Sequence, residues 1–204
     1  MGFRYDTRHL TPQVQQIINQ RDENDKQVLK SESTPSKKEN YSVYPIAIFV
    51  RLGFDNLSKL SGIQTLQVYE QFCSKDEIVW FSTDSLATGM ADKKRAEFLK
   101  AINEEFVVEI YFAVGKTGGG TNEIVYKAEV VDVVSDAEGI SSPDKTLTPN
   151  EWKDGKKKIW IKLKKLIPFS NLSTTDFMVA STGNILANSI GNSEYHFGYI
   201  KRKS

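Results

Sequence analysis

The chain has 204 residues, with 27 Lys and Arg against 26 Asp and Glu, so its net charge is +1. With 39% hydrophobic and 26% charged residues, it has the composition of a soluble globular protein. It contains no run of 18 apolar residues and no apolar stretch near its start, so we expect no membrane span, no signal peptide and a cytoplasmic location.

The first forty residues are predicted to lie outside the main domain. Thr11 and Pro12 suit the start of a helix that runs to Lys30, but the apolar residues that follow do not form a continuous stripe. Residues 31–40 are polar and have the composition of a linker. We therefore expect a helical or disordered appendage over 1–40, which is also the candidate segment for a protein partner, and one globular domain over 41–204.

The first half of this domain alternates between strand and helix patterns. Residues 44–52 (YPIAIFVRL) and 77–83 (EIVWFST) are apolar, β-branched and aromatic, which is typical of buried strands. Residues 56–72 carry apolar side chains mostly at helical spacing, with a break expected at Gly62. Residues 92–106 give the clearest helical pattern, with their apolar side chains on one face.

The second half is mainly strand. Residues 107–114 and 124–134 flank a Gly-rich turn, which predicts a long hairpin. Residues 157–166 alternate as a strand, a short helix is expected after Asn171 or Ser173, and residues 193–200 are expected to form the last strand. The order favours an α+β fold with a curved, mostly antiparallel sheet or small barrel and flanking helices.

No catalytic or cofactor-binding constellation is visible. A single cysteine, Cys73, excludes an internal disulfide, and with only two histidines we expect no metal site. Gly115-Lys116-Thr117 resembles the end of a phosphate-binding loop, but Ile110 stands where that motif needs glycine. We expect no catalytic residues, no cofactor and no metal, and hence a binding module rather than an enzyme.

The near-neutral total charge hides a strong segregation. Residues 41–150 carry ten basic and sixteen acidic side chains, whereas residues 151–204 carry ten basic and four acidic ones. Seven of those ten basic residues fall between Lys153 and Lys165. This asymmetry indicates a nucleic acid or another polyanion as partner, although a solvated lysine-rich hairpin would give the same pattern.

Two clusters combine aromatic with polar side chains. In the first, Trp80 and Phe81 precede Ser82 and Thr83, a combination that can stack on a flipped base and hydrogen-bond its edges. A core strand followed by a capped loop would look the same. Arg51, at the end of the first strand, is a further candidate for this pocket.

The second cluster surrounds the other two tryptophans. Trp152 and Trp160 lie among lysines that could neutralise phosphates while an indole stacks on a base. The alternative is that Trp160 covers a small second core with lysine stems lying over it. The candidate backbone-contacting residues are Lys153, Lys156, Lys157, Lys158, Trp160, Lys162 and Lys164.

The order of these motifs resembles PUA-like domains of the EVE and YTH branch. The strand Lys75–Thr83 (KDEIVWFST) and the hairpin after it are similar to consecutive strands of that family. The ending SEYHFGYI, residues 193–200, resembles the closing strand of the reader domains of McrB-type modification-dependent restriction systems. The chain departs from the family in having Lys75 where glycine usually stands, and Arg51-Leu52-Gly53 in place of a Ser-Glu-Pro signature.

The resemblance implies a barrel-like sheet with a pocket for a flipped, modified base. Carried over by position, the pocket residues are Arg51, Trp80, Phe81, Ser82 and Thr83, with Trp152 as a later wall. The resulting hypothesis is a nucleic-acid reader, with DNA favoured over RNA, that targets a restriction or defence system. Two alternatives stay open: an RNA-binding PUA-like module, and a protein-interaction domain that uses residues 1–40.

Overall fold

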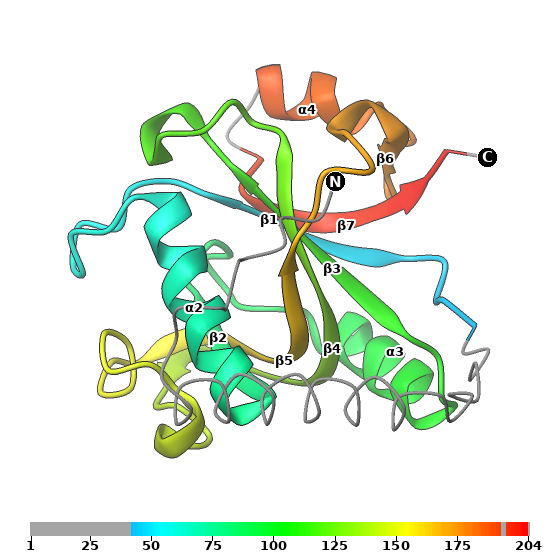
Figure 1. The fold of residues 1–204 in the computed structure, drawn as a ribbon. Coiled ribbons are helices and arrows are strands. Elements are labelled where there is room, and N and C mark those ends of the chain that lie inside the picture. Colours follow the sequence, from blue (N-terminus) through cyan, green and yellow to red (C-terminus); the bar gives the residue numbers. More distant parts are fainter. Residues whose placement is uncertain (1–41, 193–194, 204) are drawn as a thin grey trace, which may run out of the picture. The chain divides into compact units, whose positions relative to one another are not determined.

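The computed structural model describes residues 42–192 and 195–203, so the expected N-terminal helix and linker over 1–40 lie outside the described residues. The described part has an α+β fold, as predicted. Seven strands form one mixed sheet in the order β2-β5-β4-β3-β1-β7-β6, and three α-helices pack against it (Figure 1). All neighbouring strands are antiparallel except β1 and β3, which are parallel.

The centre of the sheet is made by its most apolar segments. β1 (Ala47–Leu52) lies between β3 (Val108–Val114) and β7 (Phe197–Arg202), and every residue of β3 is buried. A strand that is covered on both faces needs a continuous apolar run rather than an alternating one, which explains why both segments are so apolar. The path from β1 to its parallel neighbour β3 passes through two helices and β2 (Ile78–Thr83).

Two helices cover one face of the sheet and one covers the other. α2 (Gly62–Asp76) and α3 (Asp92–Asn103) bury Leu66, Tyr69 and Phe98 in the main core. α4 (Leu186–Asn192) packs over a smaller core on the opposite face. The helix predicted over 56–72 begins only at Gly62, because Ser61 and Gln64 form a capping box there.

The long strands β4 (Ile124–Ile140) and β5 (Lys157–Pro168) pair over most of their length, and their register shifts at three places. Such irregularities bend a strand and increase its twist, so they contribute to the curvature of the sheet. The sheet is curved, as expected, but it does not close into a barrel: β2 and the short strand β6 (Phe177–Val179) are its edges.

The region before the last strand differs most from the sequence prediction. The segment after Ser173 forms only a 3₁₀ turn, η3 (Thr174–Asp176), and the α-helix lies later, at α4. β6 was not predicted, because three residues are too few to show a period. The Gly-rich segment is the predicted hairpin tip: it holds a 3₁₀ turn, η1 (Lys116–Gly118), between the antiparallel strands β3 and β4.

Candidate functional site

A cavity of about 350 Å³ opens where β1 and β2 end beside α2, and we call it the Trp152 cavity. Its walls come from the end of β1, the loop at 53–60, the first half of α2, the end of β2 and the segment at 141–156 that joins β4 to β5. Residues from three strands, one helix and connecting loops therefore meet here, because Lys157 at the start of β5 also lines the cavity.

One wall of the Trp152 cavity is aromatic. Trp152 and Tyr69 stack with ring centroids 4.4 Å apart and planes inclined by 10°. Phe81 meets Tyr69 edge to face at 5.1 Å. All three side chains are more than nine-tenths buried, so their rings are fixed by packing before any ligand arrives. Burial also raises the pKa of the Tyr69 hydroxyl well above its ordinary value, so it stays protonated.

Asp55 anchors Trp152 to this wall. Its carboxylate accepts the indole N–H of Trp152 at 2.9 Å and the hydroxyl of Ser58 at 2.8 Å, together with the backbone N–H of Leu57 at 2.9 Å. Partial burial on its own would raise the pKa of Asp55, but these hydrogen bonds outweigh it and the pKa lies below its usual value. The carboxylate is therefore ionised at neutral pH and holds the indole in one orientation.

Small polar side chains adjoin the aromatic ones in the lining. Thr65, on α2, is 6% exposed and its hydroxyl has no hydrogen-bond partner among the described residues. Thr83 shares a hydrogen bond of 2.7 Å with Ser85. Ser82 meets the Tyr69 hydroxyl only at 3.4 Å, which is long for a hydrogen bond between hydroxyls. The cavity lining thus contains hydroxyls with spare donor and acceptor capacity, and a buried one such as that of Thr65 normally needs a partner.

A charged pair lies at the rim. Asp84 accepts a hydrogen bond from the Lys157 ammonium at 2.9 Å and another from the backbone N–H of Lys158 at 2.9 Å. The pair ties the end of β2 to the start of β5. With Asp55 nearby, the cavity has two carboxylates and one ammonium in its walls, so it favours a neutral or donor-rich ligand over an isolated anion.

Four of the six predicted pocket residues line this cavity: Phe81, Ser82, Thr83 and Trp152. The other two do not. Arg51 donates from its guanidinium to the Ile190 carbonyl at 3.2 Å, beside α4. Trp80 lies on the opposite face of β2 from Phe81, with the Lys162 ammonium 5.6 Å from its ring centroid. The assignment of Arg51 and Trp80 to the same pocket as Phe81 is corrected, because neither side chain lines the cavity.

Trp160 is not placed to stack on a base. It is fully buried, and its indole N–H donates to the Ile140 carbonyl at 2.9 Å. The stacking role predicted for Trp160 is therefore wrong, because its ring is covered by the protein itself.

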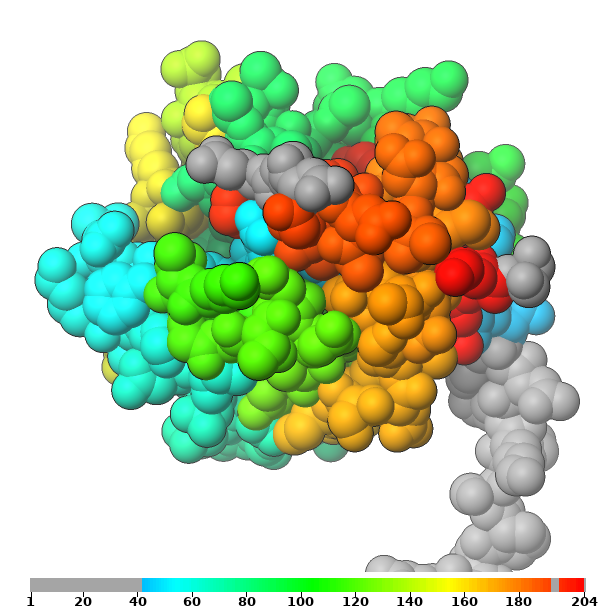
Figure 2. Space-filling model, turned by 90° about the horizontal axis from the view of Figure 1, so that it is seen from above, coloured from blue at the N-terminus to red at the C-terminus, as the bar shows by residue number. Residues whose placement is uncertain are grey.

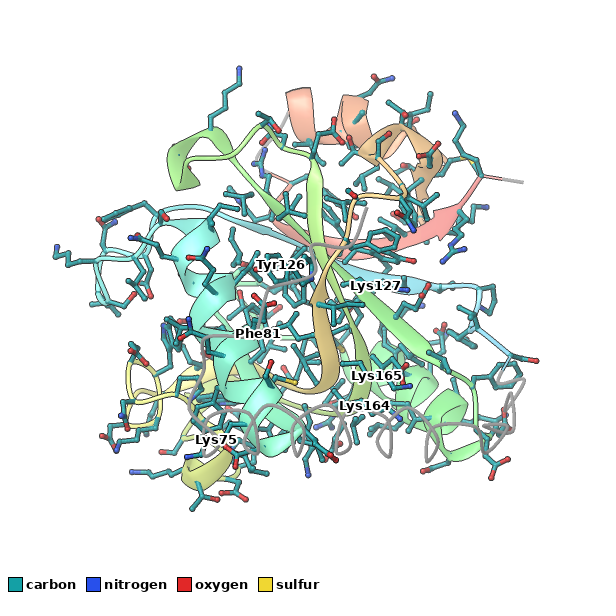
Figure 3. The ribbon with its side chains drawn as sticks, in the orientation of Figure 1. Lys75, Phe81, Tyr126, Lys127, Lys164 and Lys165 are labelled. Carbon is teal, nitrogen blue, oxygen red and sulfur yellow. The ribbon has the colours of Figure 1, made fainter. Side chains whose placement is uncertain are left out.

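The predicted lysine strip is divided by the fold. Lys157 pairs with Asp84, and Lys158 donates its ammonium to the Ala87 carbonyl. Lys164 pairs with Glu129 at 3.2 Å, opposite Ile78 at the start of β2 and hence roughly 10 Å along that strand from Phe81, where the cavity lining begins. Figure 3 shows Lys164 beside Lys165, with Phe81 on the other side of β5 in this view.

Within the described part of the chain, the side chains of Lys153 and Lys156 form no hydrogen bond or ion pair, although the backbone N–H of Lys153 donates to the Pro149 carbonyl. In contrast, Lys157 and Lys164 are neutralised by Asp84 and Glu129, which belong to the acidic segment 41–150. The basic run in the sequence is therefore not one continuous positive surface.

Sequence reasoning missed three members of the site: Asp55, Thr65 and Tyr69. The two on α2 are four residues apart, so they share a helix face. That spacing was visible, but a buried helix face gives the same pattern. Nothing local in the sequence connects Asp55 to Trp152, which is 97 residues away.

A second, larger cavity of about 440 Å³ lies between the start of β1 and the strands β6 and β7; we call it the Arg202 cavity. Glu109, which is 7% exposed, accepts hydrogen bonds from the Tyr111 hydroxyl at 2.6 Å and from Arg202 at 2.9 Å. Lys127 lies 3.4 Å from the same carboxylate. Every buried charge here has a partner, so we assign this cavity to the structure of the domain rather than to a ligand.

Within residues 42–192 and 195–203, no three His, Cys, Asp or Glu side chains are grouped so that they could hold a metal ion. Cys73 is buried. None of the described helices has the length and apolar character needed to cross a membrane. Comparison of the chain with protein-family models, with curated proteins and with solved structures finds no match in any of the three.

Proposed function

We propose that the Trp152 cavity binds a base flipped out of a nucleic acid, with DNA preferred over RNA, so that the domain acts as a reader of the PUA-like kind. The observation that carries the proposal is the pairing of a fixed aromatic wall with a buried, unpartnered hydroxyl on Thr65. A flat heterocycle uses both: its faces pack against rings and its edges need donors and acceptors.

The dimensions of the cavity support this ligand class. Its volume of about 350 Å³ lies at the lower end of the usual range for small-molecule sites, roughly 300–1,000 Å³. Ser82 and Thr83 supply further hydroxyls that can bind the edge of a base. Because Asp84 and Asp55 are acceptors only, a base that carries an exocyclic amine suits the site better than one that carries only carbonyl groups.

The net charge around the cavity is slightly positive, which supports a weak attraction to phosphates. The segments 53–60, 83–85 and 141–158 contribute to its walls, and the turn at 115–120 packs against Leu52 and Gly53. Together they carry seven lysines and five carboxylates, an excess of two positive charges. We therefore expect salt-sensitive binding of modest strength.

A methyl group on the base adds apolar area against the aromatic wall and is worth about 1–3 kcal/mol of discrimination. We extend the proposal to a modified base as the preferred ligand, and to a restriction or defence system as the setting that such a reader would target.

The test is a titration of labelled duplexes, with and without a methylated cytosine or adenine, followed by fluorescence anisotropy at about 50 and about 200 mM salt. We expect binding at the lower salt that favours a methylated duplex and weakens at the higher salt. Ser82→Ala should weaken binding several-fold, whereas Ser74→Ala, at the far end of α2, should leave it unchanged. If neither duplex binds at low salt, the proposal is wrong; a preference for RNA of the same sequence would assign the site to RNA instead.

A further inference from the structure

The loop at 53–60, between β1 and α2, carries the most exposed large apolar side chain of the described residues. Leu57 is 84% exposed and Phe54 is 47% exposed. Figure 1 shows this loop extending away from the sheet at the left, and Figure 2 shows the same cyan region projecting from the side of the molecule. An apolar side chain so far out in water is unfavourable unless something covers it.

The loop is held in one shape by its own hydrogen bonds. The Asp55 N–H donates to the Leu60 carbonyl at 2.8 Å, and the Leu57 N–H donates to the Asp55 carboxylate at 2.9 Å. Lys59 has a φ of 60°, which is uncommon for a residue with a side chain and closes the turn. Leu57 is therefore presented on a constrained loop.

The same loop forms part of the Trp152 cavity. Phe54 and Asp55 line it, and the carboxylate that fixes the Leu57 amide also accepts the indole N–H of Trp152. The side chain of Asp55 thus connects Leu57, at the apolar tip, to Trp152, in the aromatic wall of the cavity.

Two exposed lysines belong to this loop and to the turn packed against its start. Lys59 belongs to the loop itself, and Lys116 lies in η1. The η1 turn packs directly against the start of the loop: a Cβ atom on Gly118 would come within 2.9 Å of the Leu52 carbonyl oxygen. An apolar tip on a loop that carries one lysine and packs against a turn that carries another fits a duplex, whose stacked bases are apolar and whose phosphates are negative.

We propose that Leu57 is a wedge that enters the base stack of duplex DNA and fills the gap left by the base held in the Trp152 cavity. The inference rests on the proposed function and adds the form of the substrate: a duplex whose base is flipped, rather than a strand that is already single. Flipping costs the stacking of the extruded base, and an inserted apolar side chain offsets part of that cost. A base in a single strand needs no such replacement.

The experiment compares Leu57→Ala with the wild-type chain on a duplex and on the single strand of the same sequence, with 2-aminopurine next to the target base to report unstacking. We expect the variant to bind the duplex about tenfold more weakly, with a smaller rise in 2-aminopurine fluorescence, and to bind the single strand within about twofold of wild type. Ile167→Ala is the matched control, because Ile167 is 46% exposed on β5 and does not line the Trp152 cavity.

The outcomes separate the two proposals. Equal losses on duplex and single strand, or no loss on either, would overturn the wedge while leaving a base-binding cavity in place. If the wild-type chain binds neither form, the proposed function falls and the wedge falls with it.

Discussion

The two cavities differ in how their polar groups are satisfied. The Arg202 cavity is larger, at about 440 Å³ against about 350 Å³, yet its buried carboxylate on Glu109 is bonded to Tyr111 and Arg202. The smaller Trp152 cavity holds a buried hydroxyl on Thr65 that has no partner in the described part of the chain. Since native proteins rarely leave buried polar atoms unpaired, unmet hydrogen-bonding capacity distinguishes the candidate site better than volume does.

The largest effect is expected from the Arg202 cavity. Phe177 is fully buried there and packs against Tyr111 with ring centroids 4.8 Å apart. Phe177→Ala should lower the free energy of unfolding by about 3–5 kcal/mol, because it removes a buried ring and leaves a void. Urea denaturation measures the loss. The affinity of the folded variant for oligonucleotides should stay at the wild-type value, and a selective loss of affinity would instead make the Arg202 cavity a ligand site.

A smaller loss is expected when the buried carboxylate loses its cation. Arg202→Met leaves Glu109 with Tyr111 and Lys127 as partners. We expect about 1–2 kcal/mol of destabilisation, less than for a fully buried pair, because the Arg202 side chain is 54% exposed. Thermal unfolding checks this prediction. An unchanged melting temperature would show that Glu109 is adequately satisfied without Arg202.

Acid should loosen the Trp152 cavity selectively. Hydrogen bonds from Trp152 and Ser58 hold the pKa of Asp55 below its usual value. The ionised carboxylate therefore stabilises the fold above its unfolded-state pKa of about 3.9, and this contribution is lost as pH falls through the lower folded-state pKa. The indole N–H resonance of Trp152 should shift over that range.

Trp160 provides the internal control for this titration, because its indole N–H bonds to a backbone carbonyl that does not titrate. Asp55→Asn should remove the pH dependence of the Trp152 signal. Parallel shifts of both indole resonances would mean that acid acts on the whole domain.

Among these variants, Thr65→Val is expected to change stability least. It should nevertheless weaken the binding of the oligonucleotide. Thr65→Val removes a buried hydroxyl that has no partner within the described residues, so the free energy of unfolding should stay the same or rise by up to about 1 kcal/mol. Affinity for the preferred oligonucleotide should fall about tenfold if a base edge uses that hydroxyl.

The matched control is Thr148→Val, because the buried Thr148 hydroxyl donates to the Asp144 carbonyl at 2.7 Å. This variant should lose about 1 kcal/mol of stability and keep its affinity. If Thr65→Val lowered stability as Thr148→Val does, the Thr65 hydroxyl would have a partner of its own in the free protein.

The sequence predicted the fold class and most elements because the relevant signals are local. The β-branched strand over 77–83 and the helical face over 92–106 need no distant partner to be recognised. It also predicted four of the residues that line the cavity. Asp55 and Thr65 were missed because their roles depend on contacts with chain segments far away, as in the bond from Asp55 to Trp152.

The distribution of charge shows most clearly what the sequence determines and what only the tertiary structure determines. The sequence by itself determined that a basic final quarter follows an acidic body, and that aromatic and small polar residues adjoin at the end of one strand. Only the tertiary structure decided which of those charges meet: it set Lys157 against Asp84 and Lys164 against Glu129, and it buried Trp160 while placing Trp152 at a cavity. The physical reason is that charge pairing and burial are set by distance in space, which strand pairing and register determine.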